Sequence, residues 1–264
     1  MKILSLTAIA AAGLLAAACS ASTLRAEPID DAPRRTIVLE HGAFADGSSW
    51  DEVIQRLTRD RYRVVAAADP LRGVAADAAA LSSVLATVDG PVVLVGHSYG
   101  GSVISAAAAG NPKVEALVYV AAFLPESGET ALDLTGRFPG STLPDTLAQT
   151  PGPDGIDLTI RQDRFPAQFA ADVDPARAAL MAATQRPIAQ SALTEPAPAA
   201  AWHTIPSWDV ITTEDRNIPA EAQRFMARRA GAHAVEVAAS HSVAVSHPDV
   251  VADVIAEATR SEKG

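Results

Sequence analysis

The segment that decides the fold reads Pro91-Val92-Val93-Leu94-Val95, then Gly96-His97-Ser98-Tyr99-Gly100-Gly101, then an Ala-rich stretch over residues 102–109. This order predicts a buried strand, a sharp turn and a helix. Ser98 then sits at the tip of a Gly-x-Ser-x-Gly turn, where the flanking glycines leave no Cβ to clash. Backbone N–H groups at the start of the helix would lie near a developing oxyanion. The segment therefore predicts a nucleophilic serine.

A serine hydroxyl needs a base to accept its proton and a third group to orient that base. The chain has four histidines downstream of Ser98, namely His203, His233, His241 and His247. We predict that His241 is the base, because it follows the short apolar segment 234–238 and lies in a polar loop at the end of that strand. His247 is the rival, although the Pro248 that follows it favours a position at the start of a helix.

The acid is expected in the loop after the preceding strand, which we place at residues 207–212. Asp215 and Glu214 both lie in the following loop, residues 213–218. We favour Asp215 and keep Glu214 as the alternative. Asp209 lies inside the strand, too early to reach a histidine at the carboxyl edge of the sheet.

An oxyanion hole needs a second backbone donor, from the loop after the first strand. Residues 36–39 predict that strand, and Glu40-His41-Gly42-Ala43-Phe44 follow it. The expected donors are the N–H of Tyr99 and that of Ala43 or Phe44. We interpret His41 as a residue that orders this loop.

Strand-like and helical patterns alternate along the chain, which is typical of a parallel sheet with helices on both faces. We expect six core strands, near residues 36–40, 62–67, 91–95, 114–120, 207–212 and 233–238. Helices are expected near residues 49–59, 74–87, 99–110, 219–230 and 247–260. Residues 124–203 break the alternation, with weaker helical patterns near 172–184, and predict a cap inserted over the active site.

The chain at this point resembles the α/β-hydrolase superfamily, in particular the branch of plant methyl esterases, hydroxynitrile lyases and related bacterial esterases. The segments that carry the resemblance are His41-Gly42-Ala43 with Gly47-Ser48-Ser49-Trp50, the Ser98 motif, and residues 119–125, 213–219 and 240–241. The resemblance implies an α/β-hydrolase fold, with a core over residues 36–123 and 204–260 and a cap over 124–203. It also places Ser98, Asp215 and His241 on the triad positions. Glu40 departs from the family, which usually has an apolar residue there.

The resemblance and the motif together predict a serine hydrolase that cleaves carboxylic esters of small, largely apolar substrates through an acyl-enzyme. Lactonase or perhydrolase activity on the same triad, cleavage of carbon–carbon bonds as in hydroxynitrile lyases, and a ligand-binding sensor that retains the triad are the alternatives. The lyases carry a threonine and a lysine where this chain has Gly42 and Ser242. Because neither Gly42 nor Ser242 carries the positive charge that would stabilise a cyanide anion, the sequence favours ester hydrolysis over cyanohydrin cleavage.

The composition excludes several partners. The chain of 264 residues carries 21 basic and 31 acidic residues, a formal charge of −10, which argues against nucleic acid as a partner. No nucleotide-binding, paired-cysteine or zinc-binding motif is present in the sequence, so we expect neither a cofactor nor a metal. The expected partner is a small-molecule ester.

Residues 1–26 predict an export signal, because Lys2 precedes an apolar run over residues 3–18 that is too short to span a bilayer. Residues 15–20 resemble a bacterial lipobox around Cys19, the single cysteine of the chain. Cleavage there would give a lipid-anchored lipoprotein, and cleavage after a later alanine would give a soluble periplasmic or secreted enzyme. Residues 27–35 form the expected tether.

Overall fold

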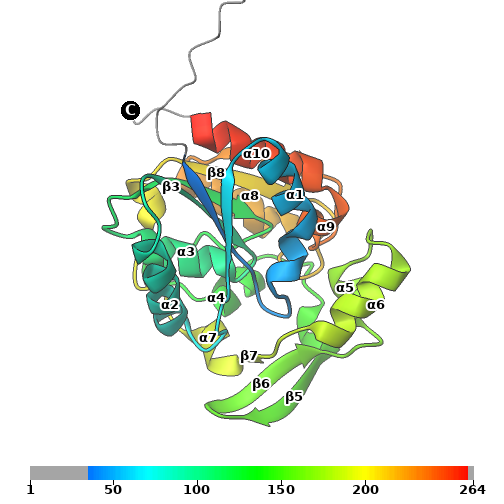
Figure 1. Ribbon diagram of the computed structural model, residues 1–264. Helices are drawn as coiled ribbons and strands as arrows, with labels where there is room; N and C mark the ends of the chain where they lie inside the picture. The colour runs from blue at the N-terminus through cyan, green and yellow to red at the C-terminus, as the bar shows by residue number, and fades with distance from the viewer. Residues whose placement is uncertain (1–34, 261–264) are drawn as a thin grey trace, which may run out of the picture. The chain divides into compact units, whose positions relative to one another are not determined.

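The computed structural model describes residues 35–260, and the expected export signal and most of the tether lie outside this range. A six-stranded parallel sheet has the spatial order β2-β1-β3-β4-β8-β9 (Figure 1). Its strands are β1 (Thr36–Glu40), β2 (Arg63–Ala67), β3 (Val92–His97), β4 (Val114–Val120), β8 (Ser207–Thr212) and β9 (His233–Val237). Each predicted strand is confirmed to within two residues at either end.

The central strands are apolar throughout because both faces of the sheet are covered. On one face, Ile37 and Leu39 of β1 pack in a core with α1 (Asp51–Arg59), α9 (Val243–Ser246) and α10 (Pro248–Arg260). On the other face, Val38 packs in a core that includes α2 (Val74–Ala86), α3 (Gly100–Ala108) and α8 (Ala220–Ala230). Figure 1 shows α2 and α3 on the opposite side of the sheet from α1 and α10. The fold is therefore the predicted one, with helices on both faces.

The long segment between β4 and β8 contains a fold element that the sequence analysis missed. Besides α4 (Ala131–Gly136), α5 (Phe165–Phe169), α6 (Pro175–Thr184) and α7 (Gln190–Thr194), it forms a three-stranded antiparallel sheet. This second sheet consists of β5 (Leu147–Gly152), β6 (Gly155–Ile160) and β7 (Ile188–Ala189) (Figure 1). Pro153-Asp154-Gly155 closes the hairpin and is the turn signal that could have revealed it.

Short 3₁₀ turns complete the described chain, at Gly47–Trp50 before α1, at Leu143–Thr146 before β5 and at Ala201–His203 before β8. Helix α6 begins as its sequence suggests, because the side chain of Asp174 accepts from the N–H groups of Ala176 and Arg177. Within residues 35–260, none of the helices has the length and apolarity needed to cross a membrane.

Candidate active site

Ser98 lies on a strained turn between β3 and α3. Its φ is 54°, in the left-handed region, which costs a non-glycine residue about 1–3 kcal/mol. Three backbone hydrogen bonds hold the turn: the N–H of Ser98 donates to the carbonyl of Val120 at 3.2 Å, and its carbonyl accepts from Gly101 at 3.0 Å and from Phe123 at 3.1 Å. The turn projects the hydroxyl of Ser98 beyond the carboxyl end of the sheet.

The glycines of the turn are required by close backbone contacts. A Cβ on Gly96 would lie 2.6 Å from the carbonyl oxygen of Gly100, and one on Gly100 would lie 2.7 Å from that of His41. Distances this short do not occur in unstrained structures. The sequence motif therefore reflects how closely β3, α3 and the loop after β1 approach one another.

We expect Gly101→Ala to lower the free energy of unfolding by about 1–3 kcal/mol. The added Cβ would lie 2.3 Å from the carbonyl oxygen of Phe123, a backbone atom that cannot move without disturbing the turn. Gly136→Ala is the matched control, because Gly136 ends α4 and nothing lies within 4 Å of its added Cβ. Urea unfolding measures both, and equal losses in the two variants would contradict this reading of the turn.

The structure brings Ser98, His241 and Asp215 together in one hydrogen-bonded line. Nε2 of His241 lies 2.8 Å from the hydroxyl oxygen of Ser98, and Nδ1 lies 2.7 Å from Oδ2 of Asp215. The side chains of His241 and Asp215 are 1% and 0% exposed. Since Nδ1 donates to the carboxylate, Nε2 is free to accept the serine proton.

Asp215 lies in a pocket of donors that suits a buried carboxylate. Its Oδ1 accepts from the N–H groups of Asn217 at 2.7 Å and Ile218 at 3.0 Å. Its Oδ2 accepts from the hydroxyl of Thr212 at 2.9 Å and the amide of Gln223 at 3.1 Å, in addition to His241. A buried charge is tolerated when its lone pairs are satisfied in this way. The sequence carried no signal for Gln223, which lies within a helix.

Two further aromatic rings position His241. Nε2 of His97 donates to the carbonyl of His241 at 2.9 Å, and burial lowers the pKa of His97 to about 3, so that ring stays neutral. The ring of Phe169 lies edge-on to His241 with the ring centroids 4.8 Å apart. Neither residue is predicted from the sequence, because each acts through a contact between segments that are distant in sequence.

The three other histidines downstream of Ser98 have partners outside the triad. Nδ1 of His247 lies 3.5 Å from Asp172, Nε2 of His203 lies 2.9 Å from Glu126, and His233 stacks on Trp208 with ring centroids 5.1 Å apart. The alternative acid Glu214 is exposed.

Asp209 lies within β8, and both of its carboxyl oxygens are buried with no hydrogen-bond partner among the described residues. Burial raises its pKa well above the usual value.

The expected oxyanion donors line one pocket with Ser98 and His241. Ala43, Phe44 and Tyr99 all contribute to this pocket. Phe44 has a φ of 60°, so the loop after β1 is strained at this point. Gly42 is needed here, because a Cβ would lie 2.6 Å from the Cβ of Ser98.

The rest of the pocket wall is apolar and comes largely from the segment between β4 and β8. It consists of Phe123, Ala131, Leu132, Thr135, Leu143, Pro144, Leu147 and Leu193, with Asn217 and Ile218 from the loop of Asp215. The free volume is about 80 Å³, less than the few hundred cubic ångströms that a drug-sized ligand occupies. Leu132 lines the pocket and is 53% exposed, so the pocket wall reaches the protein surface at this residue.

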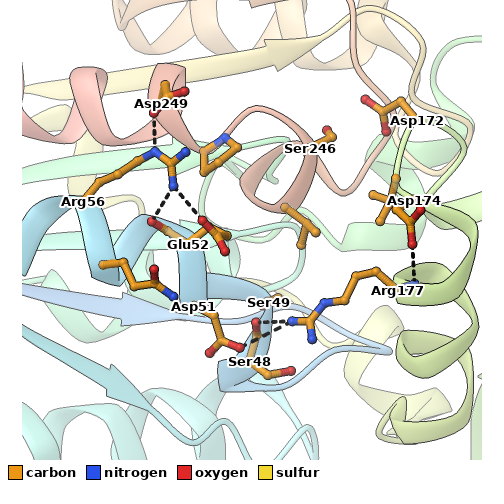
Figure 2. Close-up of a pocket in the computed structure, with 14 residues that line it drawn as sticks. Ser48, Ser49, Asp51, Glu52, Arg56, Asp172, Asp174, Arg177, Ser246 and Asp249 are labelled. Carbon is orange, nitrogen blue, oxygen red and sulfur yellow. Dashed lines mark hydrogen bonds and ion pairs between the residues drawn. The ribbon is translucent and has the colours of Figure 1, made fainter.

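A second, more open cleft of about 600 Å³ contains no residue of the triad. Figure 2 shows that charged side chains line it, with Arg56 hydrogen-bonded to Glu52 and Asp249. Arg177 of α6 extends across to the core, where it donates to the carbonyl of Ser48 at 2.9 Å (Figure 2). This cleft lies at the interface between α6 and the core.

At the same interface, the segment between β4 and β8 is hydrogen-bonded to the loop of His241. Ser240 donates to Asp172 through both its hydroxyl and its N–H, and the hydroxyl of Ser242 donates to the carbonyl of Phe169 at 2.8 Å. Burial raises the pKa of Asp172, but the hydrogen bonds from Ser240 outweigh it and hold that pKa below its usual value. Asp172 is therefore an ionised anchor for the residue that precedes His241.

Within residues 35–260, no group of three or more histidine, cysteine or acidic side chains has a geometry that could hold a metal ion.

Comparison with known proteins supports the fold and the family of the chain. A family model described as the alpha/beta hydrolase family matches residues 37–254. A carbendazim-hydrolysing esterase from Nocardioides sp. (strain SG-4G) is 32% identical over 125 residues, which cover 42% of this chain and 50% of that protein. The match thus spans about half the length of that relative.

Solved structures share the architecture over most of the chain. A pyrethroid hydrolase from Sphingobium faniae JZ-2 superposes with a TM-score of 0.71 at 26% identity, covering 86% of this chain and 98% of that one. Polyneuridine aldehyde esterase superposes with a TM-score of 0.74 at 19% identity, covering 85% and 99%. At that identity the second likeness concerns the fold alone.

Proposed function

Because the chain belongs to the alpha/beta hydrolase family, we propose that it is a serine esterase that cleaves carboxylic esters through an acyl-enzyme. The observation that carries the proposal is the continuous line of hydrogen bonds from Ser98 through His241 to Asp215. A neutral imidazole whose Nδ1 is held by a buried carboxylate can accept a proton at Nε2 and return it later.

The reaction follows from this geometry. Nε2 of His241 takes the proton of Ser98 while the serine oxygen attacks the ester carbon, and the backbone N–H groups of Tyr99 and of Ala43 or Phe44 stabilise the oxyanion. His241 then gives the proton to the leaving alcohol, and the acyl group stays on Ser98. Water, deprotonated by the same imidazole, releases the acid.

The apolar pocket wall supports an apolar substrate. Leu143, Leu147 and Leu193 would contact an acyl or alcohol group next to Ser98, and burial of each methylene would contribute about 0.8 kcal/mol. The present free volume is small, so a larger substrate requires movement of the inserted segment. Residues 124–203 would thus act as the cap that excludes water.

Cyanohydrin cleavage is disfavoured by the same pocket. A departing cyanide anion needs a cation, and none of the residues that line this pocket is basic apart from the histidine of the triad. Ser242, at the position of the lyase lysine, is tied to Phe169. Gly42, at the position of the lyase threonine, has no room for a Cβ.

A panel of alkyl and aryl esters, lactones and mandelonitrile tests the proposal against purified protein, with Ser98→Ala as the blank. We expect Ser98-dependent turnover of esters and no cyanide release above the solvent background. Preferred turnover of lactones, or perhydrolysis in the presence of peroxide, would reassign the activity within the fold. Cyanide release that is lost in Ser98→Ala, or a ligand retained unchanged without turnover, would contradict it.

A further inference from the structure

Three carboxyl groups lie buried beneath the loop that follows β1, and the mechanism above uses none of them. Glu40 is the last residue of β1, Asp69 follows β2, and Asp77 belongs to α2. Their exposed fractions are 1%, 0% and 0%. The carboxyl of Glu40 faces that of Asp69, and the carboxyl of Asp69 faces that of Asp77, so each pair can share a hydrogen bond only when one of its members is protonated. We call these three residues the carboxyl chain.

One end of the carboxyl chain holds Tyr99. The hydroxyl of Tyr99 donates to Oδ2 of Asp77 at 2.8 Å, and the N–H groups of Arg72 and Gly73 donate to the same carboxylate. Tyr99 follows Ser98 directly, and its backbone N–H is the first expected oxyanion donor. The side chain of Tyr99 is therefore anchored to Asp77, in addition to the backbone hydrogen bonds that hold the turn.

The middle of the carboxyl chain holds the loop that carries the second donor. The N–H of Asp69 donates to Nε2 of His41 at 3.1 Å, and Nδ1 of His41 donates to the carbonyl of Gly42 at 2.9 Å. The N–H of Leu71 donates to Oδ1 of Asp69 at 2.8 Å, which fixes that carboxyl. Ala43 is the next residue along the loop after Gly42.

The contacts between these carboxyls require protons. Oε2 of Glu40 and Oδ2 of Asp69 are buried and receive no donor from the described part of the chain. Burial and, secondarily, the charges of neighbouring carboxylates raise the pKa of Glu40 to about 10 and that of Asp69 to about 8. At neutral pH Glu40 therefore donates to Asp69, and Asp69 donates to Asp77.

We propose that the carboxyl chain positions both backbone donors of the oxyanion hole and that it does so only while it keeps its protons. The inference rests on the proposed esterase function. Loss of a proton would place two carboxylates in contact without a donor between them, and they would repel. The repulsion would displace His41 on one side and Tyr99 on the other, and small displacements of this kind cost catalysis heavily.

The other charged and titratable groups around the carboxyl chain do not account for a loss of activity between pH 7 and pH 10. Arg186 donates to the backbone carbonyl of Asp69 rather than to its carboxyl. Burial lowers the pKa of His41 and raises that of Tyr99, so both are neutral from pH 7 to pH 10. The remaining charged neighbours lie at the edge of the cluster: Asp46, Arg72 and Glu195.

The test is the pH dependence of kcat and KM for ester hydrolysis from pH 7 to pH 10, in the wild type, Asp69→Asn and Asp69→Leu. The Asn amide donates to Asp77 and accepts from Leu71 as the protonated carboxyl does, but it cannot titrate. We expect the wild type to lose at least about ten-fold in kcat between pH 7 and pH 9 with little change in KM, and Asp69→Asn to lose much less over that interval, because Glu40 alone titrates in the variant and does so near pH 10.

The second variant breaks the carboxyl chain. In Asp69→Leu we expect kcat at pH 7 to fall about 10- to 100-fold with KM nearly unchanged, and affinity for an alkyl boronic acid to fall in parallel, because both depend on the oxyanion donors. If Asp69→Leu does not fold, Tyr99→Phe replaces it, with an expected loss of about ten-fold in kcat.

Stability provides a readout that needs no catalysis. The carboxyls of Glu40 and Asp69 titrate near pH 4 to 5 in an unfolded chain and much higher in the folded one, so folding takes up protons. Their contribution is complete below pH 4, declines as pH rises above the unfolded-state pKa values, and is fully lost above about pH 8 for Asp69 and about pH 10 for Glu40. The unfolding midpoint in urea should therefore fall between pH 5 and pH 10 in the wild type and fall less in Asp69→Asn, with the difference arising between pH 5 and pH 8.

The outcomes separate the two proposals. Identical alkaline profiles of the wild type and Asp69→Asn would overturn the inference and leave the esterase intact. Wild-type kcat and boronate affinity in folded Asp69→Leu, or in Tyr99→Phe where that variant takes its place, would do the same. Absence of Ser98-dependent hydrolysis by the wild type at pH 7 would overturn the proposed function instead.

Discussion

Replacement of Ser98 by alanine is expected to reduce kcat for ester hydrolysis by about four to six orders of magnitude. Among residues 35–260, the hydroxyl of Ser98 is the one side-chain nucleophile hydrogen-bonded to Nε2 of His241, at 2.8 Å. The residual rate would come from the oxyanion donors and substrate binding alone. Steady-state hydrolysis of a chromogenic ester, corrected for the buffer rate, measures the loss.

Ser102→Ala is the matched control for this variant. Ser102 is also buried and belongs to α3, the helix that follows the turn of Ser98, but it does not line the pocket of Ser98. We expect it to retain turnover within a few-fold of wild type. A comparable loss in both variants would indicate damage to the turn rather than loss of a nucleophile.

Replacement of Asp215 by asparagine is expected to lower kcat by about 10³- to 10⁴-fold, the size of effect that a misoriented tautomer produces in serine proteases. The Asn amide would donate to Nδ1 of His241, so that the ring proton moves to Nε2 and cannot be joined there by the serine proton. The backbone donors Asn217 and Ile218 would still find an oxygen to bind.

Glu214→Gln distinguishes the two acids that the sequence left open. Glu214 precedes Asp215 but is exposed, so its neutralisation should change kcat less than about two-fold. Hydrolysis rates at pH 7 for both variants decide between them. A larger loss from Glu214→Gln than from Asp215→Asn would show that the alternative acid is the functional one.

The sequence predicted those parts of the molecule that local pattern determines. The strand, glycine turn and helix around Ser98 are determined by apolar periodicity and by backbone contacts that exclude a Cβ at Gly96 and Gly100. The six-stranded sheet follows from the same alternation. The hairpin of β5 and β6 was not predicted, although its residues Pro153-Asp154-Gly155 are typical of a hairpin turn.

Contacts between distant segments could not be predicted in this way. Gln223 contacts Asp215 from α8, His97 supports His241 from the end of β3, and Asp172 contacts Ser240 from the inserted segment. Glu40 is the clearest example of a residue whose role the sequence does not predict. Nothing in the neighbouring sequence explains a carboxyl in an apolar strand. Its contact with Asp69 forms because β1 pairs with β2, the strand that precedes Asp69.

The most direct test of the esterase mechanism is the search for an acyl group on Ser98 during turnover. An activated ester is mixed with the enzyme, and the reaction is quenched in acid within the first turnovers. The mass of the protein is then measured by mass spectrometry, both intact and after proteolytic digestion. We expect a burst of released alcohol, a mass gain equal to one acyl group, and its location on the peptide that contains Ser98. Turnover without a burst, or an acyl group on any other residue, would contradict the mechanism.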